Sequence, residues 1–530
     1  MRHEVQSAEI AEKFTVPSPT RGWNAEDPLA NLKRGDAYQL DNWIARPGYC
    51  EIRKGFAEHV VDFTVVPESF LPYRAGASEK MFAVSDGSIY DTTSAGALGA
   101  AVVSGMANSR FQSINVSNDA GVFLLAFNGA DVPRKYDGTT WGTSVISATV
   151  GSISMTGAVI NNAMLHHRRV FLQEKDSLRV WYLPANAISG TPGLLDLGMV
   201  FPQGGGLVGM GVFSIGGGGE NPQAMAAFVT DQGEVAIYAG DNPADANAWA
   251  IAGVYTIGKP LGRRAIYNKA SDLIVVTHDG AISLRAVMAA EGDSQKYKPV
   301  TSRIKNAFAM AATSYGTKFG WETIFYPTGQ LTIVNVPITE LGRAKQFVQS
   351  QTGAWSQFIG INAVCWVYVN DQIYFAGTDG DGVKGVFRWD TGGSDNGVAI
   401  QCDLIPAFDQ FGDARFKNFT MLQPILRIAP QLRPFIDMLV DYKLTQPNNV
   451  PDSETSGGSG VWGVSLWGVG LWTSANPLRQ DWTSTTGAGY AGAPRLRVIS
   501  NPDPVSGVYP TRRCELLVCN GTYTPGSAFG

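Results

Sequence analysis

One phrase recurs along this chain: a few apolar residues, a polar turn containing Gly or Asp, and then alternating apolar residues. It occurs as MFAVSDGSIYD, VFLLAFNGADVPRKYDG, RVFLQEKDSLRVWYL, AAFVTDQGEVAIYAG, LIVVTHDGAISLRA, ETIFYPTGQLTIVNV and QIYFAGTDGDGVKGVFRWD. Period-two alternation on both sides of such a turn is typical of a β-hairpin. We therefore expect each phrase to form two antiparallel strands.

The spacing of these phrases constrains the fold further. Their turns are at Gly87, Gly129, Asp176, Gly233, Gly280, Gly329 and Gly380, so successive turns are 42 to 57 residues apart. A four-stranded blade of a β-propeller takes roughly 40–50 residues. A further hairpin, KQFVQSQTGAWSQFIG, fits as the second hairpin of one blade, because an isolated hairpin could not bury its face. The sequence predicts an all-β fold with a β-propeller of six to seven blades over residues 51–400.

The remaining sequence predicts two further segments. After residue 400 the strand-like stretches AFDQFGDARFKNFTMLQPILRIAP, DMLVDYKL and RLRVISN favour a second β domain, a sandwich or small barrel, over residues 401–530. Residues 1–50 read as an N-terminal anchoring segment. A composition of 61 glycines, 11% aromatic residues and only 16% charged residues agrees with short strands and tight turns.

Two glycine-rich stretches have no such rhythm. The stretch FPQGGGLVGMGVFSIGGGGENPQ, residues 201–223, is predicted to be a single loop; the order of Gly206, Gly209 and Gly211 reverses a dinucleotide fingerprint, so no nucleotide site is expected. In SGVWGVSLWGVGLW, three tryptophans repeat at intervals of five: Trp462, Trp467 and Trp472. They form either a stacked aromatic ribbon in the core or an apolar contact surface for a neighbouring subunit.

Charge and cysteine usage exclude several classes of protein. The net charge is −5 without long runs of either sign, so we expect no tight grip on nucleic acid. We interpret the short basic clusters at residues 166–169, 262–264 and 511–513 as solvated strand edges. The five scattered cysteines predict neither a disulfide framework nor a zinc site, and Cys514 and Cys519 read as buried thiols on a terminal hairpin. No secretory signal or membrane span is expected, and the chain reads as soluble and made in the cytoplasm.

The sequence offers no convincing catalytic, cofactor-binding or metal-binding residues. His278 lies in a THDG turn without a GxSxG elbow. The stretch from Lys135 to Trp141 is similar to a sialidase Asp-box but lacks its order of residues. Asp379 and Asp381 match part of a calcium-binding loop motif, but the closing Glu is missing, so a plain turn is expected. We predict that the chain is not an enzyme and needs no cofactor.

The opening phrase GWNAEDPLANLKRGDAYQLDNWIARPGYCEIRKGF carries a family resemblance. It resembles the N-terminal signature of the tail hub, or nozzle, proteins of short-tailed bacteriophages, in an order preserved through Gly22, Asn24, Asp27, Pro28, Leu32, Gly35, Ala37, Leu40, Asn42, Trp43, Arg46, Pro47, Gly48, Arg53 and Gly55. Further phrases resemble the same family, including IYAGDNPADANAWAIAGVYTIGKPLGRRA, HDGAISL, FVQSQTGAWSQF, IYFAGTDG and the tryptophan block. The resemblance covers most of the chain.

The resemblance implies a structural role in the virion tail, in a chain assembled in the host cytoplasm. Such proteins form a ring, usually of six copies, below the portal and its adaptor, in contact with other tail proteins such as fibres or spikes. The ring retains the packaged DNA and conducts it during ejection without sequence-specific binding. In this family the opening phrase is the lead-in that ties the chain to its propeller, and Trp23, Leu40, Trp43 and Ile44 would be buried against β structure while Pro28, Pro47 and Gly48 turn the backbone. The segment from Gly204 to Gly219 and the block from Trp462 to Trp472 are then expected to be interface elements. Two alternatives stay open: a propeller carbohydrate-binding adhesin and a sialidase-like glycosidase.

Overall fold

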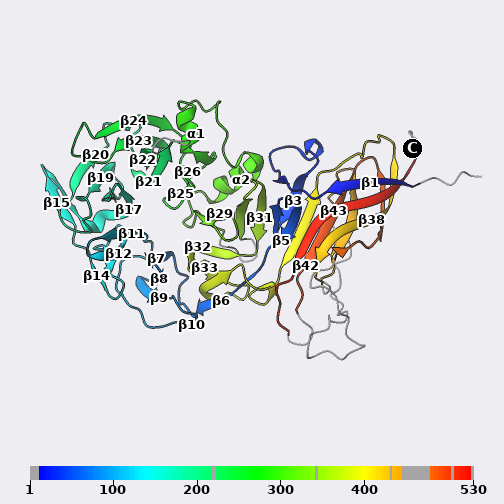
Figure 1. Cartoon of the computed structure of the whole chain (residues 1–530), viewed down its shortest axis with the longest axis horizontal. Coiled ribbons are helices and arrows are strands. Elements are labelled where there is room, and N and C mark those ends of the chain that lie inside the picture. Colours follow the sequence, from blue (N-terminus) through cyan, green and yellow to red (C-terminus); the bar gives the residue numbers. More distant parts are fainter. Residues whose placement is uncertain are drawn as a thin grey trace, which may run out of the picture. The chain divides into compact units, whose positions relative to one another are not determined.

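The computed structural model describes residues 11–216, 223–338, 340, 344–429, 432–444, 478–502 and 507–526. Its regular elements are almost all strands, with only two α-helices among the described residues, α1 (Leu284–Ala289) and α2 (Lys305–Tyr315). The predicted all-β class is therefore confirmed (Figure 1). The block from Trp462 to Trp472 lies outside the described residues, so the prediction about it stays open.

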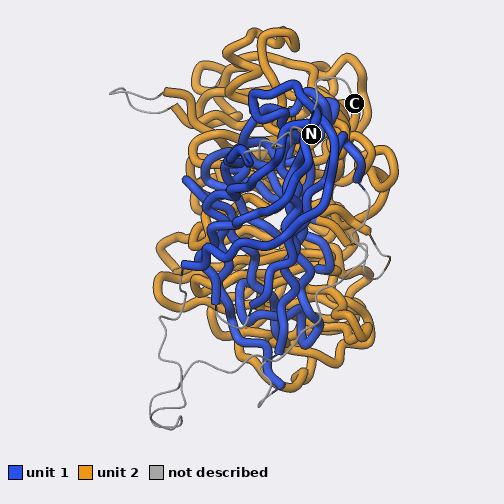
Figure 2. Tube along the Cα trace, turned by 90° about the vertical axis from the view of Figure 1, so that its right-hand side faces the viewer, with its two compact units in different colours: residues 1–57, 346–361, 390–530 blue, residues 58–345, 362–389 orange. Residues whose placement is uncertain are grey.

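The chain divides into two compact units, which Figure 2 distinguishes by colour. Unit 1 comprises residues 1–57, 346–361 and 390–530, and unit 2 comprises residues 58–345 and 362–389. Each unit is thus built from stretches that are not contiguous in the sequence.

Unit 2 contains five separate antiparallel sheets of three or four strands, each a propeller blade. The first blade comprises β7 (Ser69–Ala75), β8 (Ser78–Ser85) and β9 (Ser88–Asp91), and the second comprises β11 (Gln112–Asn118), β12 (Gly121–Phe127), β13 (Arg134–Tyr136) and β14 (Trp141–Thr143). The third comprises β17 (Ile160–His166), β18 (Arg169–Glu174), β19 (Arg179–Tyr182) and β20 (Gly193–Asp196), and the fourth comprises β21 (Leu207–Ile215), β22 (Gln223–Thr230), β23 (Glu234–Gly240) and β24 (Trp249–Thr256). The fifth comprises β25 (Ile266–Lys269), β26 (Asp272–Thr277) and β27 (Gly280–Ser283).

Two further groups of strands complete the unit. One is the hairpin of β28 (Glu322–Tyr326) and β29 (Leu331–Val336), and the other is the meander of β32 (Asn362–Val369), β33 (Gln372–Thr378) and β34 (Lys384–Trp389). The first strands of consecutive groups are neighbours, from β7 through β11, β17, β21, β25 and β28 to β32, and β32 also neighbours β7. Figure 1 shows these groups following one another around a ring.

The β-propeller arrangement is as predicted, but the count of blades is not. Five separate blades are present, whereas the spacing of the turns predicted six to seven. The difference arises because the last two groups contain the predicted hairpins but do not form separate sheets of their own. A turn pattern identifies paired strands, and it does not determine which pairs stand as independent sheets.

All seven recurring phrases form hairpins. Their strand pairs are β8 with β9, β12 with β13, β18 with β19, β22 with β23, β26 with β27, β28 with β29, and β33 with β34. In the first of them, Asp86 and Gly87 have φ angles of 46° and 63°. Two consecutive positive φ angles match the type I′ turn, which follows the natural twist of paired strands.

Apolar clusters between neighbouring blades hold unit 2 together. Leu71 and Phe82 of the first blade pack with Leu124 and Tyr136 of the second, and equivalent clusters join the second blade to the third, the third to the fourth and the fourth to the fifth. The ring closes through a cluster that joins the first blade to the β32–β34 meander, formed by Phe70, Met81, Ala83, Cys365, Val367, Tyr374, Ala376 and Val386 among others. The first four blades therefore each bury apolar side chains on both faces.

The glycine-rich stretch at residues 201–223 is not the single loop that the sequence predicted. Its middle part, Leu207–Ile215, is β21, the first strand of the fourth blade. Gly211 lies directly under Leu273 of β26, and a Cβ at Gly211 would come within 2.6 Å of the Leu273 side chain. The glycines in β21 therefore permit the close approach of the fifth blade, and composition alone made a closely packed strand look like a loop.

Unit 1 contains strands from both ends of the chain. One sheet includes β1 (Glu12–Pro17), β4 (Trp43–Arg46), β5 (Tyr49–Ile52), β38 (Lys417–Ile428), β40 (Leu478–Arg479), β41 (Thr483–Gly489) and β43 (Cys514–Pro525). A second group includes β2 (Gly22–Trp23), β3 (Asp36–Asp41), β31 (Trp355–Ile359), β37 (Gln401–Pro406), β39 (Phe435–Val440) and β42 (Gly492–Ile499). Within unit 1, β1 and β5 both pair with β43, and β3 pairs with β37.

Strand pairing brings distant segments of the chain together in unit 1. The strands of the opening segment pair with strands of the C-terminal part of the chain. The predicted hairpin around Gly353 is formed by β30 (Lys345–Ser350) and β31, and residues 346–361 belong to unit 1. The place of this hairpin as the second hairpin of a blade stays a prediction.

Candidate functional site

The opening phrase is built around the amide of Asn42. Asn42 has a φ of 60°, a left-handed conformation that Asn tolerates better than most residues. Its Oδ1 accepts hydrogen bonds from Arg53 Nε at 2.8 Å and from the Ile359 backbone N–H at 2.9 Å, while its Nδ2 donates to the Gln401 carbonyl at 2.8 Å. One side chain thereby ties together three separate segments of unit 1.

Arg53 extends this network with a bidentate ion pair. Its Nη1 donates to Asp395 Oδ1 at 2.8 Å and its Nη2 to Asp395 Oδ2 at 2.6 Å, and the Arg53 side chain is fully buried. A planar guanidinium that faces a carboxylate in this way gives geometric specificity as well as energy. Gly55 is equally constrained, because a Cβ there would overlap the carbonyl oxygen of Ser394.

The apolar residues of the phrase are also buried, as expected. Leu40 and Trp43 are fully buried, and Trp23 and Ile44 are nearly so. Pro47 and Gly48 form the turn between β4 and β5, and Gly48 has a φ of 85°. The motif that carries the family resemblance is therefore a packing and hydrogen-bonding element of unit 1. It presents no reactive group.

The predicted turn residues remain turn residues. The Asp137 carboxylate accepts hydrogen bonds from the backbone N–H groups of Thr139 and Thr140, which hold the pKa of Asp137 well below its ordinary value. Asp379 Oδ1 accepts hydrogen bonds from the backbone N–H groups of Asp381 at 3.0 Å and Val383 at 2.8 Å. The partial match to a calcium-binding loop therefore forms an ordinary Asx-type turn. His278 is exposed in its turn. The described residues contain no group of three or more His, Cys, Asp or Glu side chains placed to hold a metal ion.

All five cysteines are buried free thiols. Desolvation raises the pKa of Cys50, Cys402 and Cys519 to about 12, so little nucleophilic thiolate forms at neutral pH. Cys514 and Cys519 are buried as predicted, but they lie on the single strand β43 and not on a terminal hairpin.

Two residues of the basic clusters, His166 and Arg264, do not fit the interpretation of these clusters as solvated strand edges. His166 is buried, and its Nε2 is 2.7 Å from the carbonyl oxygen of Gly240. Arg264 is also buried, and it donates to the Glu68 carbonyl at 2.6 Å, to Ser69 Oγ at 2.5 Å and to the Phe111 carbonyl at 3.1 Å. A short basic run in the sequence does not indicate that one of its residues, here His166 or Arg264, points inward and links two blades.

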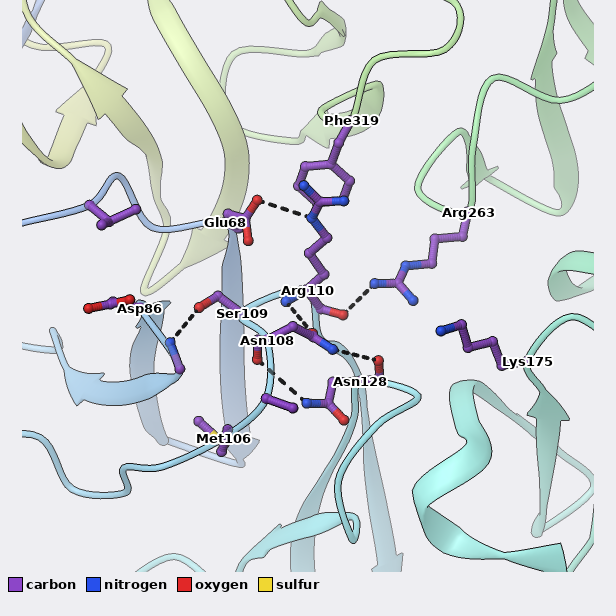
Figure 3. Close-up of a pocket in the computed structure, with 13 residues that line it drawn as sticks. Glu68, Asp86, Met106, Asn108, Ser109, Arg110, Asn128, Lys175, Arg263 and Phe319 are labelled. Atoms are coloured by element: carbon purple, nitrogen blue, oxygen red, sulfur yellow. Dashed lines mark hydrogen bonds and ion pairs between the residues drawn. The ribbon is translucent and has the colours of Figure 1, made fainter.

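Unit 2 contains a hollow of about 750 Å³, shown in Figure 3. Four of its residues lie one to three positions before the first strands of four different groups: Glu68 before β7, Arg110 before β11, Arg263 before β25 and Phe319 before β28. The turn at Asp86 and Gly87, Asn128 and Lys175 complete the wall. The hollow therefore lies at one face of the ring, where the first strands of these groups begin.

The arginines around the hollow are held in fixed positions. Arg110 Nε lies 3.0 Å from Glu68 Oε1, and the guanidinium of Arg110 lies 4.3 Å from the centre of the Phe319 ring. Arg264 faces the same ring at 5.0 Å. Arg263 donates to the carbonyl oxygens of Arg110 and Asn161, and so links segments of three blades. No local pattern in the sequence indicates this site, because its residues are spread over more than 250 positions.

Positive charge accumulates at this face of the ring. Burial, together with the neighbouring charges of Arg264 and Arg110, lowers the pKa of Arg263 to about 10. Lys175 is exposed, and its backbone N–H donates to the Val159 carbonyl at 2.9 Å. Within the described part of the chain, no hydrogen bond or ion pair of its ammonium group is identified. Figure 3 shows Lys175 and Arg263 directed into the hollow from the side opposite Asp86. Among the described residues, no helix is both long and apolar enough to cross a membrane.

Comparisons with known proteins add the following findings. No family model matches the sequence, and no curated protein matches it. Similar solved structures include chains from two crystal structures of BBS1N in complex with ARL6DN. The structure soaked with mercury matches at 8% identity with a TM-score of 0.38, and the structure soaked with lead matches at 9% identity with a TM-score of 0.37. Each match covers 64% of this chain and 98% of that chain. The β-propeller domain of Myceliophteria thermophila Cps50 (Swd1) is 13% identical, with a TM-score of 0.33 over 64% of this chain and 97% of that domain. Similarities at this level carry no argument about function.

Proposed function

We propose that this chain is a structural protein of a bacteriophage tail, one copy of the ring-shaped hub or nozzle below the portal and its adaptor. In this role it retains the packaged DNA and conducts it during ejection, and it catalyses no reaction. The observation that carries the proposal is the opening phrase, which resembles the hub signature in order. Its buried members, such as Asn42, Trp43 and Arg53, all serve the internal architecture of a β unit.

The architecture supports the proposal on physical grounds. Blades that pack face to face around a ring form a rigid unit, and a propeller leaves only short strand edges. A net charge of −5 suits a conduit for DNA, since a strongly basic wall would retain the duplex through many phosphate contacts. We further propose that six copies form the ring, as is usual in the family, and that fibres or spikes and the adaptor contact it.

We also propose that unit 1 includes a β-sandwich. In support, Phe419 of β38 packs over Gly492 of β42, where a Cβ would meet the Phe419 ring at 2.9 Å. These two strands belong to the two different sheets of unit 1. The sandwich would supply a rigid body suited to contacts between copies.

Sedimentation tests the proposed role. The purified full-length chain is mixed with portal–adaptor complexes, the genes for which we expect near its own gene. We expect a single faster-sedimenting species whose mass exceeds that of the connector by six copies of the 56.7 kDa chain. A chain that sediments alone at every ratio of the two components would contradict the proposal.

A further inference from the structure

We propose that the hollow at the face of the propeller binds a small multivalent oxyanion, a compound carrying several carboxylate or phosphate groups, between Lys175 and Arg263. The proposal concerns unit 2 alone, and it does not depend on the role in the phage tail. A volume of about 750 Å³ lies within the range of small-molecule pockets, roughly 300–1,000 Å³.

The first argument is the balance of charge. Lys175, Arg110 and Arg263 line the hollow, and Arg264 lies behind it against Phe319. The acidic residues of the lining are Glu68 and Asp86. Glu68 already pairs with Arg110, so the basic groups toward Lys175 and Arg263 are left in excess.

The second argument is that the site is preorganised. Arg263 is held in place by its hydrogen bonds to the carbonyls of Arg110 and Asn161, which belong to different blades. A guanidinium fixed in this way loses little conformational freedom when it binds an anion. Lys175 supplies a mobile ammonium beside it (Figure 3).

The polar groups of the hollow indicate the kind of ligand. The guanidiniums of Arg110 and Arg264 both lie over the ring of Phe319, at 4.3 and 5.0 Å, so the ring is already occupied by cation–π contacts. The amides of Asn108 and Asn128 are engaged with neighbouring backbone carbonyls and with Asp131. On the side of the hollow opposite Asp86, the charged groups left for a ligand are the cationic donors Lys175 and Arg263, which recognise oxyanions.

Calorimetric titration of the full-length chain with pyrophosphate and with citrate, at low salt, tests the proposal. We expect saturable one-site binding. The Lys175→Gln variant should weaken it by roughly tenfold, since a hydrogen bond to a charged group is lost. Lys175→Arg should keep most of the affinity. The control variant Lys298→Gln removes an exposed lysine of the same unit that does not line the hollow, and it should bind as the unmodified chain does.

Three results would overturn the proposal. One is the absence of saturable binding of either anion at millimolar concentration. Another is equal affinity in the unmodified chain and Lys175→Gln. The last is Lys175-dependent binding of a duplex DNA oligonucleotide without binding of either small anion, which would make the hollow a nucleic-acid contact. Lys175 is exposed, so its variants should stay folded, and thermal unfolding of each variant checks this.

Discussion

Buried residues of the opening phrase contribute to the free energy of unfolding of unit 1, and we expect a large contribution from Trp43. Its side chain is fully buried in β4. We expect Trp43→Ala to lower the free energy of unfolding of this unit by ~3–5 kcal/mol, because both the transfer energy and the packing of the ring are lost.

Urea denaturation followed by tryptophan fluorescence and circular dichroism measures this loss. Trp482→Ala is a matched control, since Trp482 is 40% exposed, and it should change stability by less than about 0.5 kcal/mol. Equal effects of the two substitutions would show that Trp43 does not anchor the segment.

Two histidines of unit 2 make its stability depend on pH. Burial lowers the pKa of both His59 and His166 below the ordinary value of 6.5. The unfolded chain therefore binds protons at these positions more readily than the folded chain, and stability should fall as the pH drops through about 6.5.

The measurement is the urea midpoint at pH 7.5 and pH 5.5. The midpoint should be lower at pH 5.5, and the difference should shrink in the His166→Gln variant. The control His278→Gln changes an exposed turn residue and should leave the difference intact. A midpoint that is independent of pH would refute the assignment.

At the scale of elements, the packing of β21 against the neighbouring blade is the most sensitive contact. A side chain at Gly211 would overlap Leu273, which is itself buried. We expect Gly211→Val to destabilise unit 2 by about 1–3 kcal/mol through overpacking.

Gly142→Val is the matched control, because Gly142 also lies in a strand, β14, but has no atom within 4 Å of a Cβ placed there. Thermal unfolding of both variants distinguishes packing from a general effect of replacing glycine. If Gly211→Val were as stable as Gly142→Val, the two blades would not be in close contact at this point.

The elements also show what the sequence could and could not predict. The seven hairpins were predictable, because alternation and turn chemistry are local properties. The place of β21 in a blade was not, since Gly209 packs against Ile266 and Gly211 against Leu273, both far along the chain. The membership of β30 and β31 in unit 1, and the hollow around Arg263, likewise depend on distant pairings. The sequence around these residues contains no catalytic motif, so no local pattern predicted the hollow.

At the scale of the whole molecule, the proposed role requires many copies of the chain to assemble about one axis. Tail hubs act through shape and rigidity, so their function depends on assembly more than on any single side chain. Substitutions that leave both units folded should therefore reduce function only where they lie at contacts between copies, at contacts with neighbouring tail proteins or along the path of the DNA.

A deletion in the glycine-rich stretch would not test ring formation without also disturbing the propeller. Residues 207–215 of the glycine-rich stretch form β21, so removal of residues 204–219 would take out the first strand of a blade. Such a deletion would unfold part of unit 2, and it could not report on ring formation alone.

Electron microscopy of the chain bound to portal–adaptor complexes tests the central claim most directly. We predict class averages with a six-fold ring of density, coaxial with the portal and open along its axis. Averages in which the connector stays bare, or in which single copies of the chain attach without rotational symmetry, would contradict the account.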